Sequence, residues 1–163
     1  MARIVLLQCE LEHRHQSPHL AMCLYASDLE ARGHQVDCAL VHPTALDDAI
    51  GKYSGRCDLL VLDSIFPFSL VRQLSDQMDV TTIVGGHNAL QHALRGAADI
   101  SVVGPGRAAL LALARAFDEG RELRGLPGGV ERAMIDQRHQ RLTPANRKGD
   151  QHNDGDRRQP EME

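Results

Sequence analysis

The amino-acid sequence predicts an α/β fold, a doubly wound five-stranded parallel sheet covered by helices and followed by a disordered C-terminal tail. Along residues 1–130, apolar runs of strand length alternate five times with helical patterns, as in a sheet built from crossover units. Hydrophobic residues make up 42% of the 163 residues but aromatic residues only 3%, so the core is expected to consist of Leu, Val, Ile and Ala. From Glu131 onward the chain is almost entirely polar.

The first strand and helix carry clear local signals. Residues 3–8 (RIVLLQ) form a continuous apolar run, which is typical of a strand buried on both faces. A helix is predicted over residues 18–32, with Ser17 as its N-cap, Pro18 at the first helical position and Gly33 just beyond its end. The spacing of apolar residues predicts one broad buried face on this helix, formed by Leu20, Ala21, Leu24, Tyr25 and Leu29.

Four more strand and helix pairs follow in the same alternation. The strands are expected at VDCALV, CDLLVLDSI, TTIVGG and DISVVG, which are residues 36–41, 57–65, 81–86 and 99–104. The helices are expected over residues 45–53, 69–78, 89–96 and 107–119. Leu110, Leu113, Ala114 and Phe117 share one stripe of the last helix. Five strands joined by crossover helices favour the flavodoxin-like, Rossmann-like order 2-1-3-4-5 with right-handed connections.

The charge distribution divides the chain into a domain of residues 1–130 and a polar tail of residues 131–163. The tail holds seven basic and seven acidic residues, so the net charge of −4 belongs to the first 130 residues. So polar a segment cannot bury enough surface to offset its ordering entropy. Residues 140–163 are therefore expected to be disordered.

Composition also excludes several classes of protein. With a net charge of −4 and a pI near 6.1, the chain has no general basic character that would attract nucleic acid. It has no apolar run long enough for a membrane span, and its start does not resemble a signal peptide. The four cysteines lack C-x-x-C spacing and lie in or beside apolar segments, which indicates free thiols in a cytoplasmic protein: Cys9, Cys23, Cys38 and Cys57.

Ligands of such sheets bind beyond the carboxyl ends of the strands, so the segments that follow the strands are the candidate site. Gly85 and Gly86 follow the fourth strand, and Gly104 and Gly106 follow the fifth. Because glycine has no side chain, each pair leaves space where a flat or bulky ligand would meet the protein, although tight turns also favour glycine. Because both pairs lie on the same edge of the sheet, we expect a ligand there.

Two further motifs leave alternatives open. GPGRAA (104–109) matches the dinucleotide fingerprint G-x-G-x-x-A, but it stands at the last strand rather than the first, so NAD or flavin binding is a minor alternative. The loop CELEHRHQSPH (9–19) is rich in imidazoles and carboxylates, and His13 and His15 are the candidate ligands for a divalent metal there. A solvated polar loop explains the same residues.

Four segments together resemble the cobalamin (B12)-binding domain found at the N-terminus of B12-dependent radical SAM enzymes. They are SPHLAMCLYASDLEARGHQVD, CDLLVLDSI, TTIVGGHNA and DISVVGPGRAALLALARAFDEGRELRGLPGG. In that family a helix ending in Gly-His precedes the second strand, and GG and G-x-G turns follow later strands. The resemblance extends from about residue 3 to residue 129.

The resemblance implies a flavodoxin-like domain that holds the corrin ring of cobalamin against the carboxyl ends of the strands. Ser64 would occupy the position after the third strand, near the nucleotide tail of the cofactor. Gly85 and Gly86 would let that tail pass close to the backbone, and Gly104 and Gly106 would line the same groove.

The chain also departs from the family pattern. The wider cobalamin-binding family carries D-x-H-x-x-G in the first loop, and its His ligates cobalt. Here the stretch is HRHQSP, so His15 matches only if His13 and Pro18 replace Asp and Gly. The family's GEGE turn is GPGR here, which loses both acidic residues. There is no C-x-x-x-C-x-x-C motif, so the chain cannot hold a radical SAM iron–sulfur cluster.

We therefore expect a stand-alone cobalamin-binding module that acts with a separate radical SAM or methyltransferase subunit, rather than a complete enzyme with catalytic residues of its own. A diverged scaffold or regulatory partner subunit that has lost cobalamin is the first alternative. A metal-binding protein that uses the His-rich loop is the second.

Overall fold

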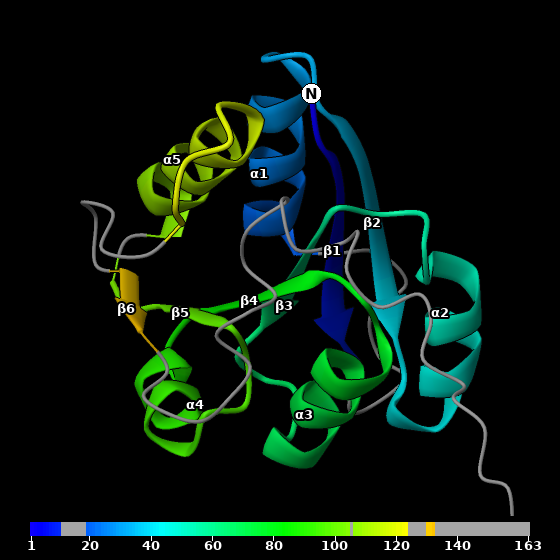
Figure 1. The fold of residues 1–163 in the computed structure, drawn as a ribbon. Coiled ribbons are helices and arrows are strands. Elements are labelled where there is room, and N and C mark those ends of the chain that lie inside the picture. The colour runs from blue at the N-terminus through cyan, green and yellow to red at the C-terminus, as the bar shows by residue number, and fades with distance from the viewer. Residues whose placement is uncertain (11–18, 105, 124–129, 133–163) are drawn as a thin grey trace, which may run out of the picture.

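The computed structural model describes residues 1–10, 19–104, 106–123 and 130–132 (Figure 1). The strands are β1 (Arg3–Cys9), β2 (Gln35–Val41), β3 (Leu59–Asp63), β4 (Thr81–Gly85), β5 (Ile100–Val102) and β6 (Val130–Arg132). The helices are α1 (Leu20–Glu30), α2 (Leu46–Tyr53), α3 (Phe68–Gln77), α4 (Ala89–Arg95) and α5 (Gly106–Asp118), and the 3-10 turn η1 (Pro43–Ala45) precedes α2.

Strands β1 to β5 are parallel and stand in the order 2-1-3-4-5, which confirms the predicted fold. The sheet has one strand more than predicted, because β6 pairs with β5 in the antiparallel direction. Three residues with a single apolar side chain give no strand signal of their own, so only the pairing with β5 defines β6. The residues of the predicted disordered tail, 140–163, lie outside the described residues.

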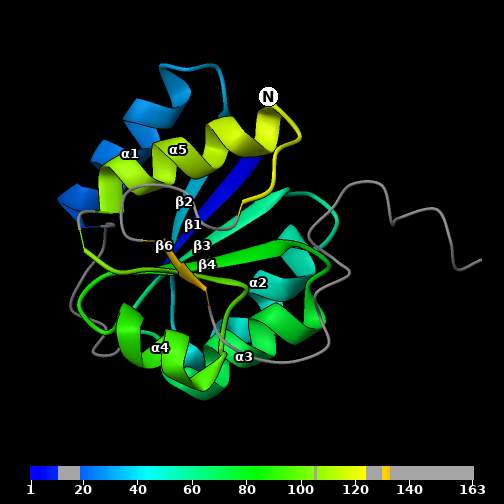
Figure 2. The same ribbon diagram turned by 60° about the vertical axis from the view of Figure 1, so that its left-hand side comes forward.

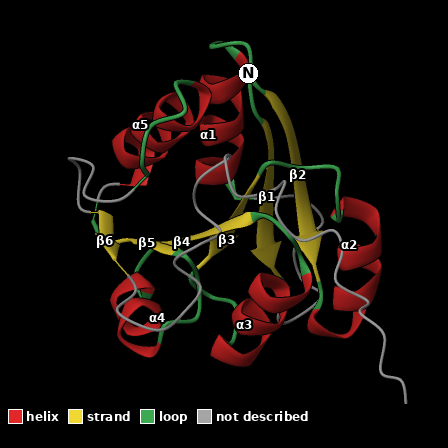
Figure 3. Cartoon of the chain, in the orientation of Figure 1, coloured by secondary structure: helices red, strands yellow, loops and turns green. Residues whose placement is uncertain are grey.

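Helices cover both faces of the sheet. Helices α1 and α5 lie over one face and α2, α3 and α4 over the other, which is clearest in the turned view of Figure 2 and in the secondary-structure colours of Figure 3. Alternate strand residues supply the two cores: Val5 and Leu7 of β1 pack on the α2–α4 side, whereas Ile4 and Leu6 pack on the α1–α5 side. This two-sided burial explains why the sequence of β1 reads as a continuous apolar run.

Helix α1 begins at Leu20, two residues later than predicted, and His19 is its N-cap. Gln8 Oε1, at the end of β1, accepts a hydrogen bond of 2.7 Å from the backbone N–H of His19 and so ties the start of the helix to the sheet. Ser17 and Pro18 lie outside the described residues. At the other end α1 stops at Glu30, two residues earlier than predicted, and Gly33, with a φ of 88°, closes the turn that follows by donating its N–H to the carbonyl of Glu30.

The prediction of the buried face of α1 was correct for Leu29 but wrong for Leu20 and Leu24. Met22 and Leu29 are buried, whereas Leu20 and Leu24 are 76% and 50% exposed. The sequence offers more apolar surface than one side of the helix can bury. The rotation of α1 is set by its contacts with β2 and α5, which no pattern within the helix records.

Two aspartates shorten the third strand at both ends relative to the predicted range 57–65. Asp58 accepts hydrogen bonds from the backbone N–H and the guanidinium of Arg3, both at 2.8 Å, and so lies before the strand rather than in it. Asp63 Oδ1 accepts from the backbone N–H of Ile65 at 3.0 Å and starts a turn. The strand therefore spans Leu59–Asp63.

The expectation of free, buried thiols is met only in part. Cys9 and Cys57 are buried, Cys38 is half-buried, Cys23 is exposed, and all four are free. Burial is the main cause that raises the pKa values of Cys9, Cys38 and Cys57 to about 11, so these three thiols are protonated at neutral pH. Across the described ranges, no helix combines the length and the apolar character needed to cross a membrane.

Two buried hydroxyls in neighbouring strands differ in how they are bonded. Thr82 of β4 is fully buried, and its hydroxyl lies 2.8 Å from Asp99 Oδ2 and 3.0 Å from Ser75 Oγ. Ser101 of β5 is also fully buried, but its Oγ has no hydrogen-bond partner among the residues that the structure describes. A buried hydroxyl without a partner opposes folding, whereas a bonded one favours it.

We therefore expect Ser101→Ala to raise the free energy of unfolding by about 1 kcal/mol, because the substitution removes a desolvated hydroxyl without leaving a cavity. Thr82→Val is the matched control and should lower the same free energy by about 1–2 kcal/mol, since it breaks bonds to Asp99 and Ser75. Urea unfolding of the three proteins measures both effects. A loss of stability in Ser101→Ala would mean that the hydroxyl is bonded in solution.

Candidate functional site

The carboxyl ends of β3 and β4 meet at Ser64, the residue that follows β3. Ser64 is 4% exposed and bonded on three sides. Its backbone N–H donates to the Gly85 carbonyl at 2.9 Å, its Oγ accepts from the Asn88 N–H at 3.1 Å, and its carbonyl oxygen lies 3.3 Å from His92 Nε2. Ser64 therefore ties the loop after β3 to the loop after β4.

Gly86 fits against Ser64 so closely that no side chain can replace its hydrogen. A Cβ added at Gly86 would lie 2.5 Å from Ser64 Oγ, and the backbone φ of 121° is one that other residues rarely adopt. Gly85 is less constrained, because a Cβ there would meet Val102 Cβ only at 3.9 Å. The structure thus brings Ser64, Gly85 and Gly86 together, as the sequence predicted for one edge of the sheet.

Gly104 and Gly106 lie on the same edge, after β5, but they face different surroundings. Gly104 is exposed with a φ of 101°, and no atom of the other described residues lies within 4 Å of where its Cβ would be. Gly106, the first residue of α5, faces α1, because a Cβ there would lie 3.3 Å from the Tyr25 hydroxyl. Open space for a ligand is therefore found at Gly104 rather than at Gly106.

The arginine of the GPGR turn has a partner within the fold. Arg107 in the first turn of α5 forms a bidentate ion pair with Asp28 of α1, with Nη2 2.7 Å from Oδ1. The pair holds the pKa of the Asp28 carboxyl below its usual range. Both side chains join the two helices on one face of the sheet, so the departure from an acidic turn has a structural explanation.

The His-rich loop after β1 contains the predicted metal and cobalt ligands. His13 and His15, the predicted metal and cobalt ligands, lie outside the described residues, and so does most of the His-rich loop. At the loop's ends, Glu10 N–H donates to the Val41 carbonyl at 3.0 Å and His19 N–H donates to Gln8. Among the residues that are described, no group of three or more His, Cys, Asp or Glu side chains is arranged to hold a metal ion.

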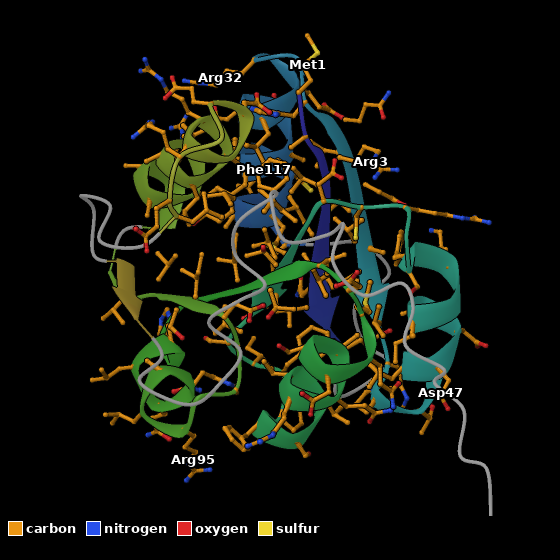
Figure 4. All side chains as sticks on the ribbon, viewed as in Figure 1. Met1, Arg3, Arg32, Asp47, Arg95 and Phe117 are labelled. Atoms are coloured by element: carbon orange, nitrogen blue, oxygen red, sulfur yellow. The ribbon has the colours of Figure 1, made fainter. Side chains whose placement is uncertain are left out.

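His92 of α4 lies beneath this edge and was not singled out by the sequence. It is 5% exposed, and its ring stacks with that of Phe68 at a centroid distance of 6.4 Å and an angle of 27°. Burial lowers the pKa of His92 below its ordinary value of 6.5; the hydrogen bond to the Ser64 carbonyl opposes this shift and the nearby Arg95 charge adds to it. Figure 4 shows Arg95 at the outer end of α4.

In the described part of the chain, the edge offers shape and hydrogen bonds rather than a reactive group. Cys9 ends β1 on this edge, but burial and, to a lesser extent, Asp63 raise the pKa of its thiol to about 11, so it is a poor nucleophile and a poor metal ligand at neutral pH. Ser64 Oγ is occupied by the Asn88 N–H. Such an edge can hold a ligand that brings its own chemistry.

Large apolar side chains are exposed on helices at either side of this edge. Leu20 begins α1 and is 76% exposed, and Leu90 in the first turn of α4 is 45% exposed. One turn further along each helix, Leu24 and Leu94 are 50% and 71% exposed. Helices α1 and α4 cover opposite faces of the sheet (Figure 2). Because each of them begins after a strand's carboxyl end, these leucines lie to either side of the edge.

Comparison with solved structures finds the same fold in a radical S-adenosylmethionine methyltransferase, TsrM from Kitasatospora setae. The chain aligns with TsrM bound to its tryptophan substrate and a SAM analogue at a TM-score of 0.60 and 22% identity, covering 80% of this chain and 28% of that one. It aligns with TsrM bound to cobalamin and a [4Fe-4S] cluster at a TM-score of 0.57 and 22% identity, covering 85% and 30%. At this identity the likeness establishes a shared fold.

A cobalamin-binding protein from Desulfitobacterium hafniense DCB-2 aligns at a TM-score of 0.45 and 19% identity, over 60% of this chain and 50% of that one. No protein-family model matches the chain. No curated protein matches it either. The chain spans less than a third of the length of the two TsrM structures.

We expect Gly86→Ala to lower the free energy of unfolding by about 2–3 kcal/mol, because the new Cβ meets Ser64 Oγ and the backbone φ is strained. Gly104→Ala is the matched control, since it has a similar φ but open space, and should cost about 1 kcal/mol. Urea unfolding measures both. In a Ser64→Ala background the cost of Gly86→Ala should shrink, and equal costs for the two glycines would contradict the close contact.

Proposed function

We propose that this chain is a cobalamin-binding module whose cofactor lies against the carboxyl ends of β3, β4 and β5. The observation that carries the proposal is the fold match over 80–85% of the chain to TsrM, one structure of which contains cobalamin. The sequence resemblance to B12-binding domains supports it independently through Ser64 and the GG and G-x-G turns.

The residues at the edge fit a large, flat ligand. Gly104 borders space that no other described residue fills, so the backbone there is accessible to a bulky group. Ser64 Oγ accepts from the Asn88 N–H, which leaves its own O–H able to donate to an acceptor on the cofactor. The protein would bind and orient the cofactor, and the corrin-held cobalt would supply the chemistry. His15 remains the proposed cobalt ligand and His13 its neighbour in the same loop.

A further polypeptide would complete the reaction. The TsrM structures are more than three times as long as the part that matches this chain, and this chain has no C-x-x-x-C-x-x-C motif. The exposed leucines of α1 and α4 flank the proposed cofactor edge from opposite faces of the sheet. A cofactor bound at the edge between the two helices would leave leucines on both of them uncovered, so we infer that a radical SAM or methyltransferase domain or subunit contacts them.

One observation favours a second candidate function, a scaffold or regulatory subunit that no longer binds cobalamin. Two glycines that the resemblance assigned to the cofactor groove have close neighbours inside the fold. Gly86 packs against Ser64, and Gly106 faces the Tyr25 hydroxyl. Both could be retained for packing alone.

Mixing the purified protein with hydroxocobalamin in dim light, desalting it and recording the visible spectrum tests the first function. We expect about one equivalent of retained corrin and its loss in Gly104→Leu, because a bulky side chain would fill the open surface at the edge. Gly51→Leu is the matched control, since Gly51 in α2 also has open space around it but lies away from the edge. A colourless wild-type protein would favour the scaffold, and equal retention in Gly104→Leu would place the cofactor elsewhere.

We also expect no iron–sulfur cluster to form when the protein is reconstituted with iron and sulfide under anaerobic conditions. Three of its four thiols are protonated at neutral pH, and none of the four has cluster-binding spacing. Iron content and electron paramagnetic resonance after reduction measure the result. A stoichiometric [4Fe-4S] signal would contradict the assignment of the cluster to another polypeptide.

A further inference from the structure

His92 holds the main chain of Ser64 from beneath the candidate edge. A carbonyl oxygen can only accept, so the 3.3 Å contact between His92 Nε2 and the Ser64 carbonyl requires the proton on Nε2. In the neutral ring Nδ1 is then an acceptor. Within the described residues Nδ1 is buried and has no hydrogen-bond partner.

A second proton on this ring would be poorly accommodated. The N–H at Nδ1 would be a buried donor with no acceptor, on a ring that is 5% exposed and stacked with Phe68. The Arg95 guanidinium lies 5.5 Å from the centre of the same Phe68 ring and adds positive charge nearby. The buried slot that holds the His92 ring beside Phe68 therefore favours the neutral ring over the cation.

The elements around α4 offer no described carboxylate that could compensate such a charge. Strands β4 and β5 contain no titratable side chain. On α3, Arg72 and Asp76 pair with each other at 3.8 Å on the surface. Asp63, at the end of β3, accepts from the Ile65 N–H, and Asp99 accepts from Thr82. The side chains of Glu131 and Arg132 in β6 lie outside the described residues.

The bond from His92 reaches the candidate site through a single residue. The carbonyl of Ser64 accepts from His92, and its N–H donates to the Gly85 carbonyl. Its hydroxyl accepts from the Asn88 N–H. The loops after β3 and β4 therefore share one buried junction. If the ring left its slot, the Ser64 main chain would lose its support on the side away from the ligand.

We propose that neutral His92 is a positioning residue that holds the loops after β3 and β4 in the arrangement that binds cobalamin, and that protonation of the ring releases them. The inference rests on the proposed function, because it assigns the junction at Ser64 to the cofactor site. It predicts that the edge retains cobalamin at neutral pH and loses it in acid.

Two variants separate the hydrogen bond from the titration. His92→Gln keeps an N–H donor at a similar distance along the side chain but does not titrate. His92→Phe keeps an aromatic ring beside Phe68 but has no donor. His34→Gln is the matched control, because His34 is also buried, at 7% exposed, and accepts from the Ala2 N–H far from the edge.

The first measurement is the affinity for hydroxocobalamin at about pH 7.5 and about pH 5, a range that spans the usual titration of histidine. For the wild type and His34→Gln we expect binding to be up to about tenfold weaker at the lower pH, because protonation of His92 competes with cobalamin binding. His92→Gln should bind as the wild type does at the higher pH and lose most of the pH dependence. His92→Phe should bind about tenfold more weakly at both. An unchanged pH dependence in His92→Gln would overturn the proposal.

The second measurement needs no cofactor and therefore separates failure of this inference from failure of the proposed function. Amide hydrogen exchange, corrected for intrinsic rates, should show the Ser64 and Asn88 amides protected at neutral pH in the wild type and in His92→Gln. Protection should fall about tenfold or more in His92→Phe, and in the wild type on acidification, while the amides of β1 stay protected. Equal protection in all proteins at both pH values would overturn the role of His92, whether or not cobalamin binds.

Discussion

The burial of β1 and β3 on both faces is the constraint on which the rest of the molecule depends. Leu6, Leu7, Leu59 and Leu60 are fully buried, and each such side chain contributes about 1.5–3 kcal/mol only while helices cover it. The chain must therefore place helices on both faces and return to the sheet between them. The chain adds further strands on either side of the central pair β1 and β3. The loops that follow β1 and β3 therefore diverge at the carboxyl ends of these strands.

The sheet could be predicted because its signals are local. Strands β1 and β3 are nearly continuous apolar runs, and Gly33 supplies the left-handed residue of the turn that follows α1. The buried face of α1 could not be predicted, because it depends on contacts with β2 and α5, which are remote in sequence. The strand β6 could not be predicted either, because its three residues are defined as a strand only by their pairing with β5.

Some residues of the candidate site could be predicted from the sequence and others could not. Gly85, Gly86 and Gly104 were found because glycines at strand ends stand out in a sequence, and Ser64 because a resemblance pointed to it. His92 lies on a helix whose leucines suggest a different buried face: Leu90 and Leu94 are exposed while the histidine is buried. The spacing of the leucines along α4 therefore does not predict that His92 is buried. Its role emerges only from its distance to a carbonyl 28 residues away in the chain.

The direction of β6 determines where the chain leaves the sheet. Val130 pairs with Val102 near the carboxyl edge, and Arg132 pairs with Ile100 toward the amino edge. The polypeptide thus re-enters the sheet beside the candidate site and departs from it at the opposite end. A reporter or affinity label joined directly after Arg132 would be attached toward the amino ends of the strands, opposite the proposed cofactor edge. The module could then be immobilised with its binding edge facing outward.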